Sequence, residues 1–287
     1  MRSDLHIHTT ASDGTWEPAR LIAEVIRQGI EVFAVTDHDT VANVTLTAQL
    51  AREAGLRFVP GVEISTTHEG RLFHILGYGI DPDNPALNQL LSHNTRLMTK
   101  KDDDSIKMLI EEGLALDFES YLAYENDAKR GGWKALNFLI DSGLCNDAAD
   151  FFTRLFKGLH QVFPVFPPPR EVTDIIKQAG GIAVLAHPAG SFSRKMNLES
   201  VLASFCREGI EGVEVFHPDH DLEKTVFCRD WSLQKSLYIT GGSDCHGDFI
   251  ESRRLGTPEV RMRQLSFGKV TDTATQESEH SKTAKIK

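Results

Sequence analysis

Cysteines are few in this chain, and none is spaced for a zinc knuckle or a redox pair. The four, Cys145, Cys206, Cys228 and Cys245, include no Cys-x-x-Cys pair, which favours free thiols in a reducing compartment. The chain also lacks an apolar run of the roughly 20 residues that a membrane helix needs. Its N-terminus has no apolar signal-peptide core. We therefore expect a cytoplasmic protein that does not contact membranes.

Positive charge is scarce as well. The 31 Lys and Arg residues are outnumbered by 41 Asp and Glu residues, giving a net charge of -10. Such a surface repels phosphate backbones, which argues against a general nucleic-acid coat. A small phosphorylated substrate remains compatible with it, held at a local patch of metal and arginine. Nothing in the sequence indicates an obligate protein partner.

What the sequence does contain is an α/β pattern long enough, at 287 residues, to bury a full core. Short apolar runs alternate with stretches of helical period, which predicts parallel βαβ units. Six or seven strands, with no Gly-rich dinucleotide turn after the first, favour a barrel over an open sheet. Strands are expected near 5–7, 31–35, 57–59, 62–64, 72–76, 181–186, 212–216 and 236–240, and helices over 18–28, 41–54 and 198–207.

The pattern changes in the middle of the chain, where helical periods continue but strand signals are nearly absent. We expect residues 1–80 and 171–262 to form two parts of one barrel, and 81–170 to form a helical insertion that caps the active site. The Pro-rich run 163–169 predicts an extended connector back to the barrel. Residues 263–287 are rich in Ser, Thr, Lys and Glu, which predicts a disordered tail.

Potential metal ligands end, or lie within, nearly every expected strand. Active sites of parallel barrels lie on the face where the strand ends meet. Several buried carboxylates on one face would repel one another unless cations lay between them. Nine ligands divide naturally among two or three metal ions, and mixed imidazole and carboxylate donors suit Mn first, with Zn or Fe as alternatives. The nine are His6, His8, Asp13, His38, Glu63, His74, His187, Asp244 and His246.

Six motifs in a fixed order connect these ligands to a known family. They are DLHIHTTASDG (4–14), VTDHD (35–39), PGVEIS (60–65), FHILGY (73–78), LAHP (185–188) and GSDCHG (242–247). Together they resemble the PHP (polymerase and histidinol phosphatase) family, especially its small bacterial phosphoesterases similar to nucleoside 3′,5′-bisphosphate phosphatases and 5′-3′ exoribonucleases. The resemblance spans residues 1–80 and 171–258. It implies a distorted seven-stranded (β/α) barrel and a trinuclear metal site.

The resemblance also implies how the ligands are shared among the metals. A complete set argues against a purely structural PHP domain and implies hydrolysis by metal-activated hydroxide. The three implied ligand groups are His6, His8, Glu63 and Asp244; Glu63, His74 and His187, with Glu63 bridging; and Asp13, His38 and His246.

Substrate contacts are less distinct in the sequence than metal ligands. Arg130, Lys134 and Arg194 are the cations expected to neutralise phosphoryl oxygens, with solvated surface residues as the alternative. His217 and His220 lie just past a strand end, and His220 resembles a histidine that the family places against the phosphate.

Two further features concern the same site. Asp37 is expected to orient a neighbouring ligand rather than bind metal. Trp133 and the pair Phe151 and Phe152 could stack a nucleobase, although core packing of the insertion is the commoner use of such aromatics.

The expected activity is hydrolysis of a phosphomonoester of a small nucleotide, such as a 3′,5′-bisphosphonucleotide, with short RNA as a further substrate. Histidinol-phosphate phosphatase activity is an alternative that the same motifs would serve. An amidohydrolase cutting C–N bonds would share the opening His-x-His, but here a glutamate has the bridging role and no lysine ends a strand. A regulatory metal domain is the non-enzyme alternative.

Overall fold

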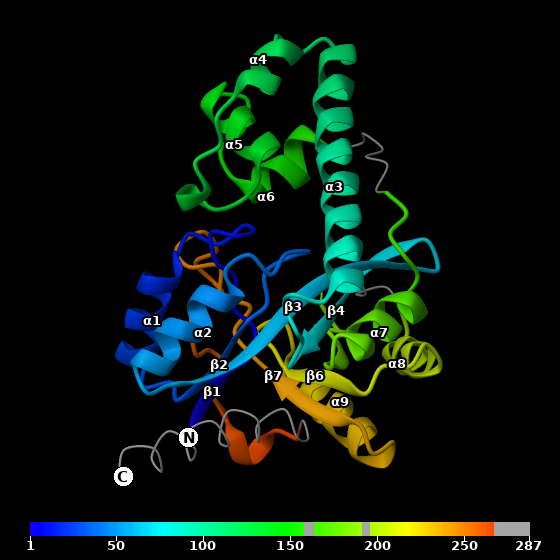
Figure 1. The fold of residues 1–287 in the computed structure, drawn as a ribbon. Coiled ribbons are helices and arrows are strands. Elements are labelled where there is room, and N and C mark those ends of the chain that lie inside the picture. Colours follow the sequence, from blue (N-terminus) through cyan, green and yellow to red (C-terminus); the bar gives the residue numbers. More distant parts are fainter. Residues whose placement is uncertain (158–163, 191–195, 267–287) are drawn as a thin grey trace.

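A computed structural model describes residues 1–157, 164–190 and 196–266. Its centre is one eight-stranded sheet in the order β7-β6-β5-β4-β3-β2-β1-β8 (Figure 1). The strands are β1 Arg2–Asp4, β2 Val32–Val35, β3 Arg57–His68, β4 Arg71–Tyr78, β5 Ile182–Leu185, β6 Gly212–Phe216, β7 Tyr238–Gly241 and β8 Val260–Arg261.

The sheet closes into a barrel because its two ends meet. β8 runs antiparallel to β1, and Ser266, shortly after β8, exchanges backbone hydrogen bonds of 2.7 and 2.9 Å with Ile239 of β7. Past the ends of β1 and β7, Ile7 forms a parallel bridge with Cys245. The α/β barrel expected from the sequence is confirmed, and the short β8 is an addition that the pattern did not predict. The rest of the expected tail, 267–287, lies outside the described residues.

Besides the short β8, one strand departs from the parallel pattern. β4 is antiparallel to both β3 and β5, because a tight turn at Glu69 and Gly70, with φ of 49° and 72°, sends the chain straight back. The strands expected at 57–59 and 62–64 are one continuous β3, and the first strand lies at 2–4 rather than 5–7. The prediction of purely parallel units is therefore wrong at β4.

Five helices cover the outside of the barrel (Figure 1). α1 shows why they do so, since it buries Leu21, Ile22 and Val25 on one face while its polar residues face solvent. The barrel interior is filled by large side chains such as Leu76 and Tyr78, so it is a packed core with polar groups gathered at one end. These helices are α1 Pro18–Arg27, α2 Val44–Glu53, α7 Pro169–Gln178, α8 Leu198–Arg207 and α9 Leu222–Gln234.

Between β4 and α7 the described residues form helices and no strand. They share a separate core around Leu109, Leu136 and Phe151, and they stand at one end of the barrel in Figure 1. The expected bounds of the insertion, 81 and 170, and its role in capping the active site stay predictions. The helical elements here are α3 Pro85–Glu111, α4 Phe118–Ala123, the 3-10 helix η1 Ala128–Arg130, α5 Lys134–Asp141, α6 Ala148–Asp150 and the π-helical η2 Phe151–Leu155; η4 Met262–Gln264 follows β8.

The long helix α3 is fixed to the barrel near its base. Asn94 donates hydrogen bonds to Asp39 Oδ1 at 2.8 Å and to the Ser65 carbonyl at 2.9 Å. Asp39 also accepts from the Ser65 amide and hydroxyl, so α3 is joined to the loop after β2 and to β3 through one buried carboxylate. None of the helices in the described ranges is long and apolar enough to cross a membrane.

Candidate metal centre

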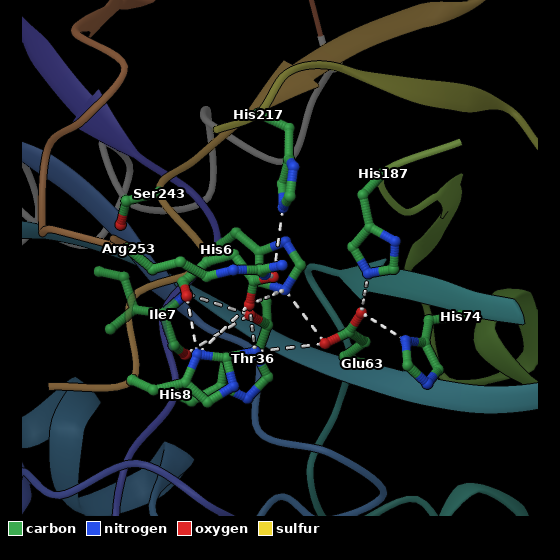
Figure 2. Close-up of polar contacts among 12 residues, drawn as sticks. His6, Ile7, His8, Thr36, Glu63, His74, His187, His217, Ser243 and Arg253 are labelled. Atoms are coloured by element: carbon green, nitrogen blue, oxygen red, sulfur yellow. Dashed lines mark hydrogen bonds and ion pairs between the residues drawn. The ribbon is translucent and has the colours of Figure 1, made fainter. Parts of the chain in front are cut away.

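A dense group of imidazole and carboxylate side chains lies at one end of the barrel (Figure 2). The parallel bridge between Ile7 and Cys245 puts the loop after β1 beside the loop after β7, and a second bridge puts His38 beside Glu63. All nine side chains predicted from the sequence come together here. The ninth, His187, joins through its 2.8 Å contact with Glu63. Donor atoms of the other eight form overlapping groups within 4.8 Å: His8, Asp13, His38 and His246; His6, His8, Glu63 and Asp244; and His38, Glu63 and His74.

Glu63 lies at the centre of this group, and its two oxygens face different histidines. Oε1 lies 2.8 Å from His187 Nε2 and 3.1 Å from His74 Nδ1. The side chain is fully buried, so the carboxylate is surrounded by ring nitrogens on both sides, as a bridging ligand requires. Oε2 lies within 3.4 Å of the ring nitrogens of three further residues: His6, His8 and His38.

Asp244 uses its two oxygens differently. Oδ1 lies 3.0 Å from His8 Nε2 and 3.4 Å from His6 Nε2. Oδ2 accepts a hydrogen bond of 3.2 Å from His217 Nε2 and contacts Arg253 Nη1. Oδ1 therefore faces the other predicted ligands, whereas Oδ2 is held by His217 and Arg253.

The donor atoms fit a divalent metal ion. His8 Nε2 and Asp244 Oδ1 are buried and have no hydrogen-bond partner in the described part of the chain, although only 3.0 Å separates them. Buried polar atoms without hydrogen bonds are costly unless a cation satisfies them. His187 and Asp244 also have positive φ, 26° and 50°, a sparsely populated conformation that is enriched at functional sites.

Charges inside the group compensate one another. Although burial opposes its charge, the pKa of His6 is raised to about 10 by Glu214 and Glu63. Burial lowers the pKa of His38 to about 3, against the pull of Glu63 and Asp13. Burial alone would raise the pKa of Glu63, but His38, His6 and other histidines hold it well below its usual range. Glu63 is thus a carboxylate and His38 a neutral imidazole, the forms that bind metals.

Asp37 lies behind the group: its carbonyl accepts a hydrogen bond of 3.2 Å from the Glu63 amide, and its side chain is turned to the loop after β1. Its oxygens accept hydrogen bonds from the Thr9 amide at 2.7 Å, the Thr9 hydroxyl at 2.6 Å and the Ser12 hydroxyl at 2.6 Å. These bonds fix the turn that carries His8 and Asp13. The contacts agree with the expected orienting role, and a direct catalytic role for Asp37 stays a prediction.

The cations predicted to contact substrate have other partners. Arg130 forms two hydrogen bonds to Asp141, of 2.7 and 2.8 Å, and Lys134 Nζ donates to the Leu122 carbonyl at 2.9 Å. Their loop nevertheless touches the site, because the Gly132 amide donates to the Asp13 carbonyl at 2.8 Å. Arg194 lies outside the described residues. All three assignments stay predictions.

His217 and His220 lie against the site but are engaged by the protein itself. His220 Nδ1 donates to the Val215 carbonyl at 2.9 Å, and Nε2 accepts from the Ala189 amide at 3.3 Å. Burial lowers the pKa of His220 to about 4, which keeps the ring neutral in this arrangement. The expected contact between His220 and a phosphate would require one of these bonds to open, and the contact stays a prediction for both histidines.

Three residues of the site were not assigned from the sequence. Glu214 accepts from His6 Nδ1 at 2.8 Å and from the His187 amide at 2.7 Å, and a charged residue inside the apolar run Val213–Val215 was the available signal. Asp4 accepts hydrogen bonds from the backbone amides of Ser243 and Gly256 in the loop that carries Asp244. Arg253 lies in a polar loop whose sequence gives no sign of a site residue, because the side chain meets Asp244 only in the folded chain.

A family model and several curated relatives match much of this chain. The PHP domain family matches residues 4–136. A phosphoribosyl 1,2-cyclic phosphate 1,2-diphosphodiesterase of Eggerthella lenta is 31% identical, over 87% of this chain and 95% of its own. A 5′-3′ exoribonuclease of Haemophilus influenzae is 31% identical, over 85% and 89%. A 3′,5′-nucleoside bisphosphate phosphatase of Chromobacterium violaceum is 28% identical, over 89% and 91%.

A solved structure from Bifidobacterium adolescentis shares the fold. It matches with a TM-score of 0.75 over 95% of this chain and 94% of its own, at 23% sequence identity. The barrel and the helices at its polar end are therefore an arrangement found in an experimental structure.

Proposed function

Because this chain belongs to the PHP domain family and is a metal-dependent phosphoesterase, we propose that it hydrolyses a phosphomonoester of a small nucleotide, such as a 3′,5′-bisphosphonucleotide. The observation that carries this proposal is the group of nine converging imidazole and carboxylate side chains around Glu63. The names of the Haemophilus influenzae and Chromobacterium violaceum relatives support a nucleotide or short RNA as the substrate.

We propose that the nine side chains hold two or three divalent ions, manganese first, in the three groups implied by the family motifs. Ions held there would acidify a water molecule to a nucleophile at neutral pH and neutralise phosphoryl oxygens. The chain's own part is to fix the donors. Glu63 spans the group with both oxygens, Glu214 holds His6 by Nδ1 so that Nε2 faces inward, and Asp37 fixes the turn before Asp13.

The substrate's second phosphate is proposed to lie on the side of the insertion. The loop Arg130–Gly132 is hydrogen-bonded to Asp13 through the Gly132 amide, and the guanidinium of Arg130, two residues away, is proposed to leave Asp141 for this phosphate. Lys134, Arg194, His217 and His220 remain the other proposed contacts. A 5′-phosphorylated RNA end would likewise present a terminal phosphomonoester beside a second phosphoryl group.

The test compares hydrolysis of four compounds after the bound metals have been quantified, measuring free phosphate, mononucleotides released from the RNA and the ring-opened phosphomonoester from the cyclic compound. These are 3′-phosphoadenosine 5′-phosphate, histidinol phosphate, a short 5′-phosphorylated RNA and a phosphoribosyl 1,2-cyclic phosphate. The highest kcat/KM is expected for the bisphosphonucleotide. Preference for histidinol phosphate would overturn the nucleotide assignment, and inactivity on all four despite a full metal complement would overturn the proposal as a whole.

A second candidate is hydrolysis of a cyclic phosphate ester. The observation in its favour is the Eggerthella lenta relative, which matches nearly its whole length. A higher kcat/KM for opening the cyclic ester to a phosphomonoester than for phosphate release from the bisphosphonucleotide would establish it.

A further inference from the structure

Arg253 is partly buried at the edge of the metal group and has no assigned role. It lies in the loop between β7 and β8, and its side chain is 20% exposed. Within the described residues it is the one Lys or Arg side chain that forms an ion pair with any of the nine predicted ligands. Figure 2 shows it extending into the group beside His6. A cation in this place must affect either the ligands or the substrate.

The guanidinium joins two carboxylates. Nη1 contacts Asp244 Oδ2, and Nη2 donates to Asp219 Oδ2 at 3.0 Å. Asp219 is itself fixed, because its amide donates to His217 Nδ1 at 3.1 Å. The planar fork of an arginine holds a defined direction when both of its terminal nitrogens are bound. Arg253 is thus anchored on one side by Asp219 and presented to Asp244 on the other.

Both donors to Asp244 approach the same oxygen. His217 Nε2 donates to Oδ2 at 3.2 Å, and Arg253 contacts that oxygen as well. Oδ1 has no hydrogen-bond partner in the described part of the chain and faces His6 and His8. A carboxylate with both oxygens available can rotate and bind a metal through both. Two donors on Oδ2 prevent that rotation.

We propose that Arg253 is a positioning residue that, with His217, restricts Asp244 to binding metal through Oδ1 alone. This inference rests on the proposed assignment of Asp244 as a metal ligand. The guanidinium charge also withdraws electron density from the carboxylate, which makes Asp244 a weaker donor and leaves the metal a stronger Lewis acid. A direct substrate contact fits the geometry less well, because both terminal nitrogens of Arg253 are bound to carboxylates.

The variants are Arg253→Gln, which removes the charge and the fork, and Arg253→Lys, which keeps only the charge. Arg254→Gln is the matched control, because Arg254 is exposed and donates only to the Glu251 carbonyl. Asp219→Asn leaves Arg253 in place but weakens its anchor. It decides the question if Arg253→Gln does not fold.

Each variant is loaded with cobalt(II), whose visible absorption reports the number and geometry of its ligands. Arg253→Gln is expected to bind the same number of ions with an altered spectrum and to lose activity about 10- to 100-fold, in kcat rather than in KM. Arg253→Lys should recover part of the loss, Asp219→Asn should change the spectrum in the same direction, and Arg254→Gln should match the parent.

Two results would overturn the proposal. One is a parent-like cobalt spectrum in both Arg253→Gln and Asp219→Asn. The other is a loss confined to KM, together with weaker inhibition by inorganic phosphate, which would assign Arg253 to the substrate. Because the spectra need no substrate, they decide the role of Arg253 even if the parent releases no phosphate from any compound, a result that would overturn the proposed function separately.

Discussion

Glu63 and Asp244 are both buried carboxylates among histidines, but their surroundings divide their oxygens in different ways. Both oxygens of Glu63 face ring nitrogens of the group. Asp244 directs only Oδ1 inward, while His217 and Arg253 hold Oδ2. The first arrangement suits a carboxylate that spans two metal ions, and the second suits one that binds a single ion through one oxygen. The residue type alone does not distinguish these two uses.

Glu63→Gln tests the central position. The amide keeps the size of the side chain but places an N–H donor against imidazoles whose lone pairs should face a metal. We therefore expect metal content and phosphate release to fall together, and phosphate release to fall by about 100-fold or more. Metal analysis and kcat/KM measure the two effects. Glu69→Gln, at the exposed tip of the β3–β4 turn, is the control and should keep both. Full activity in Glu63→Gln would disprove the bridging assignment.

Asp4→Asn tests a residue that fixes the loop between β7 and β8, which carries Asp244 and His246, without facing the metals. Asp4 Oδ1 accepts from the Ser243 amide at 2.9 Å, and Oδ2 accepts from the Gly256 amide at 2.8 Å. An asparagine keeps one acceptor and turns a donor toward the other amide, so the free energy of unfolding should fall by about 2 kcal/mol. Urea denaturation of the metal-free protein measures it. Asp174→Asn, on the exposed side of α7, should leave stability unchanged, and an equally stable Asp4→Asn would contradict the anchoring role.

The site residues that could be found from the sequence are those whose position along a strand predicts where the side chain points. His6, His38 and Glu63 follow or lie in apolar runs, and strand ends of a barrel meet on one face. The partners that fix them were not predictable in this way. The bond of Glu214 to His6, the contact of Arg253 with Asp244 and the bond of the Ala189 amide to His220 depend on distant parts of the chain meeting in space. Periodicity carries no information about such contacts.

At the scale of elements, the reversed strand β4 is the main departure from the expected pattern. Apolar periodicity gives the same signal for a parallel and an antiparallel strand, and only the short turn at Glu69–Gly70 shows that no crossover helix fits between β3 and β4. The reversal matters for the site. It pairs His74 with Ser65, which brings the His74 ring to Glu63 from a strand that runs the opposite way.

The loop before α5 is the element that joins the helices between β4 and α7 to the metal group. Gly131 has a φ of 73°, and a Cβ at this position would lie 2.7 Å from Phe249 Cβ and 2.9 Å from the Asp13 carbonyl. The loop therefore fits against the ligand-bearing turn only with glycine there. This contact is the strongest structural support for placing the substrate between the insertion and the barrel.

Gly131→Ala should separate the loop from the Asp13 turn. We expect a rise in KM for a nucleotide substrate, together with a loss of about 1 to 3 kcal/mol in stability from the backbone alone, because a φ of 73° with a ψ of -178° is a conformation that essentially only glycine adopts. Gly143→Ala is the control, because Gly143 also has a positive φ, 71°, but a Cβ there would meet nothing within 4 Å. It should lose less stability and keep the parent KM. Equal kinetics in the two variants would show that the loop does not shape the substrate site.

At the scale of the whole molecule, the barrel joins distant parts of the sequence at one end and leaves carboxylates concentrated there. Asp13, Glu63, Glu214 and Asp244 lie within or against the group, and Arg253 is the nearby guanidinium that pairs with it in the described part of the chain. The barrel class and the polar end could be predicted from alternating elements and motif order. Closure by β8 and Ser266 could not, because a strand of two residues leaves no periodic signal.

This concentration of carboxylates predicts that metal ions stabilise the whole fold. Ions that bind the folded chain and not the unfolded one add about 2.7 kcal/mol at a hundred times their dissociation constant, which corresponds to a rise in Tm of about 5 to 10 °C for a chain of this size. Calorimetry of chelator-treated protein with increasing manganese measures this rise. Glu63→Gln should show a much smaller rise than the parent, whereas Glu69→Gln should follow the parent. A Tm independent of manganese in the parent would mean that the converging donors of the barrel end do not bind the ion, however well their geometry fits it.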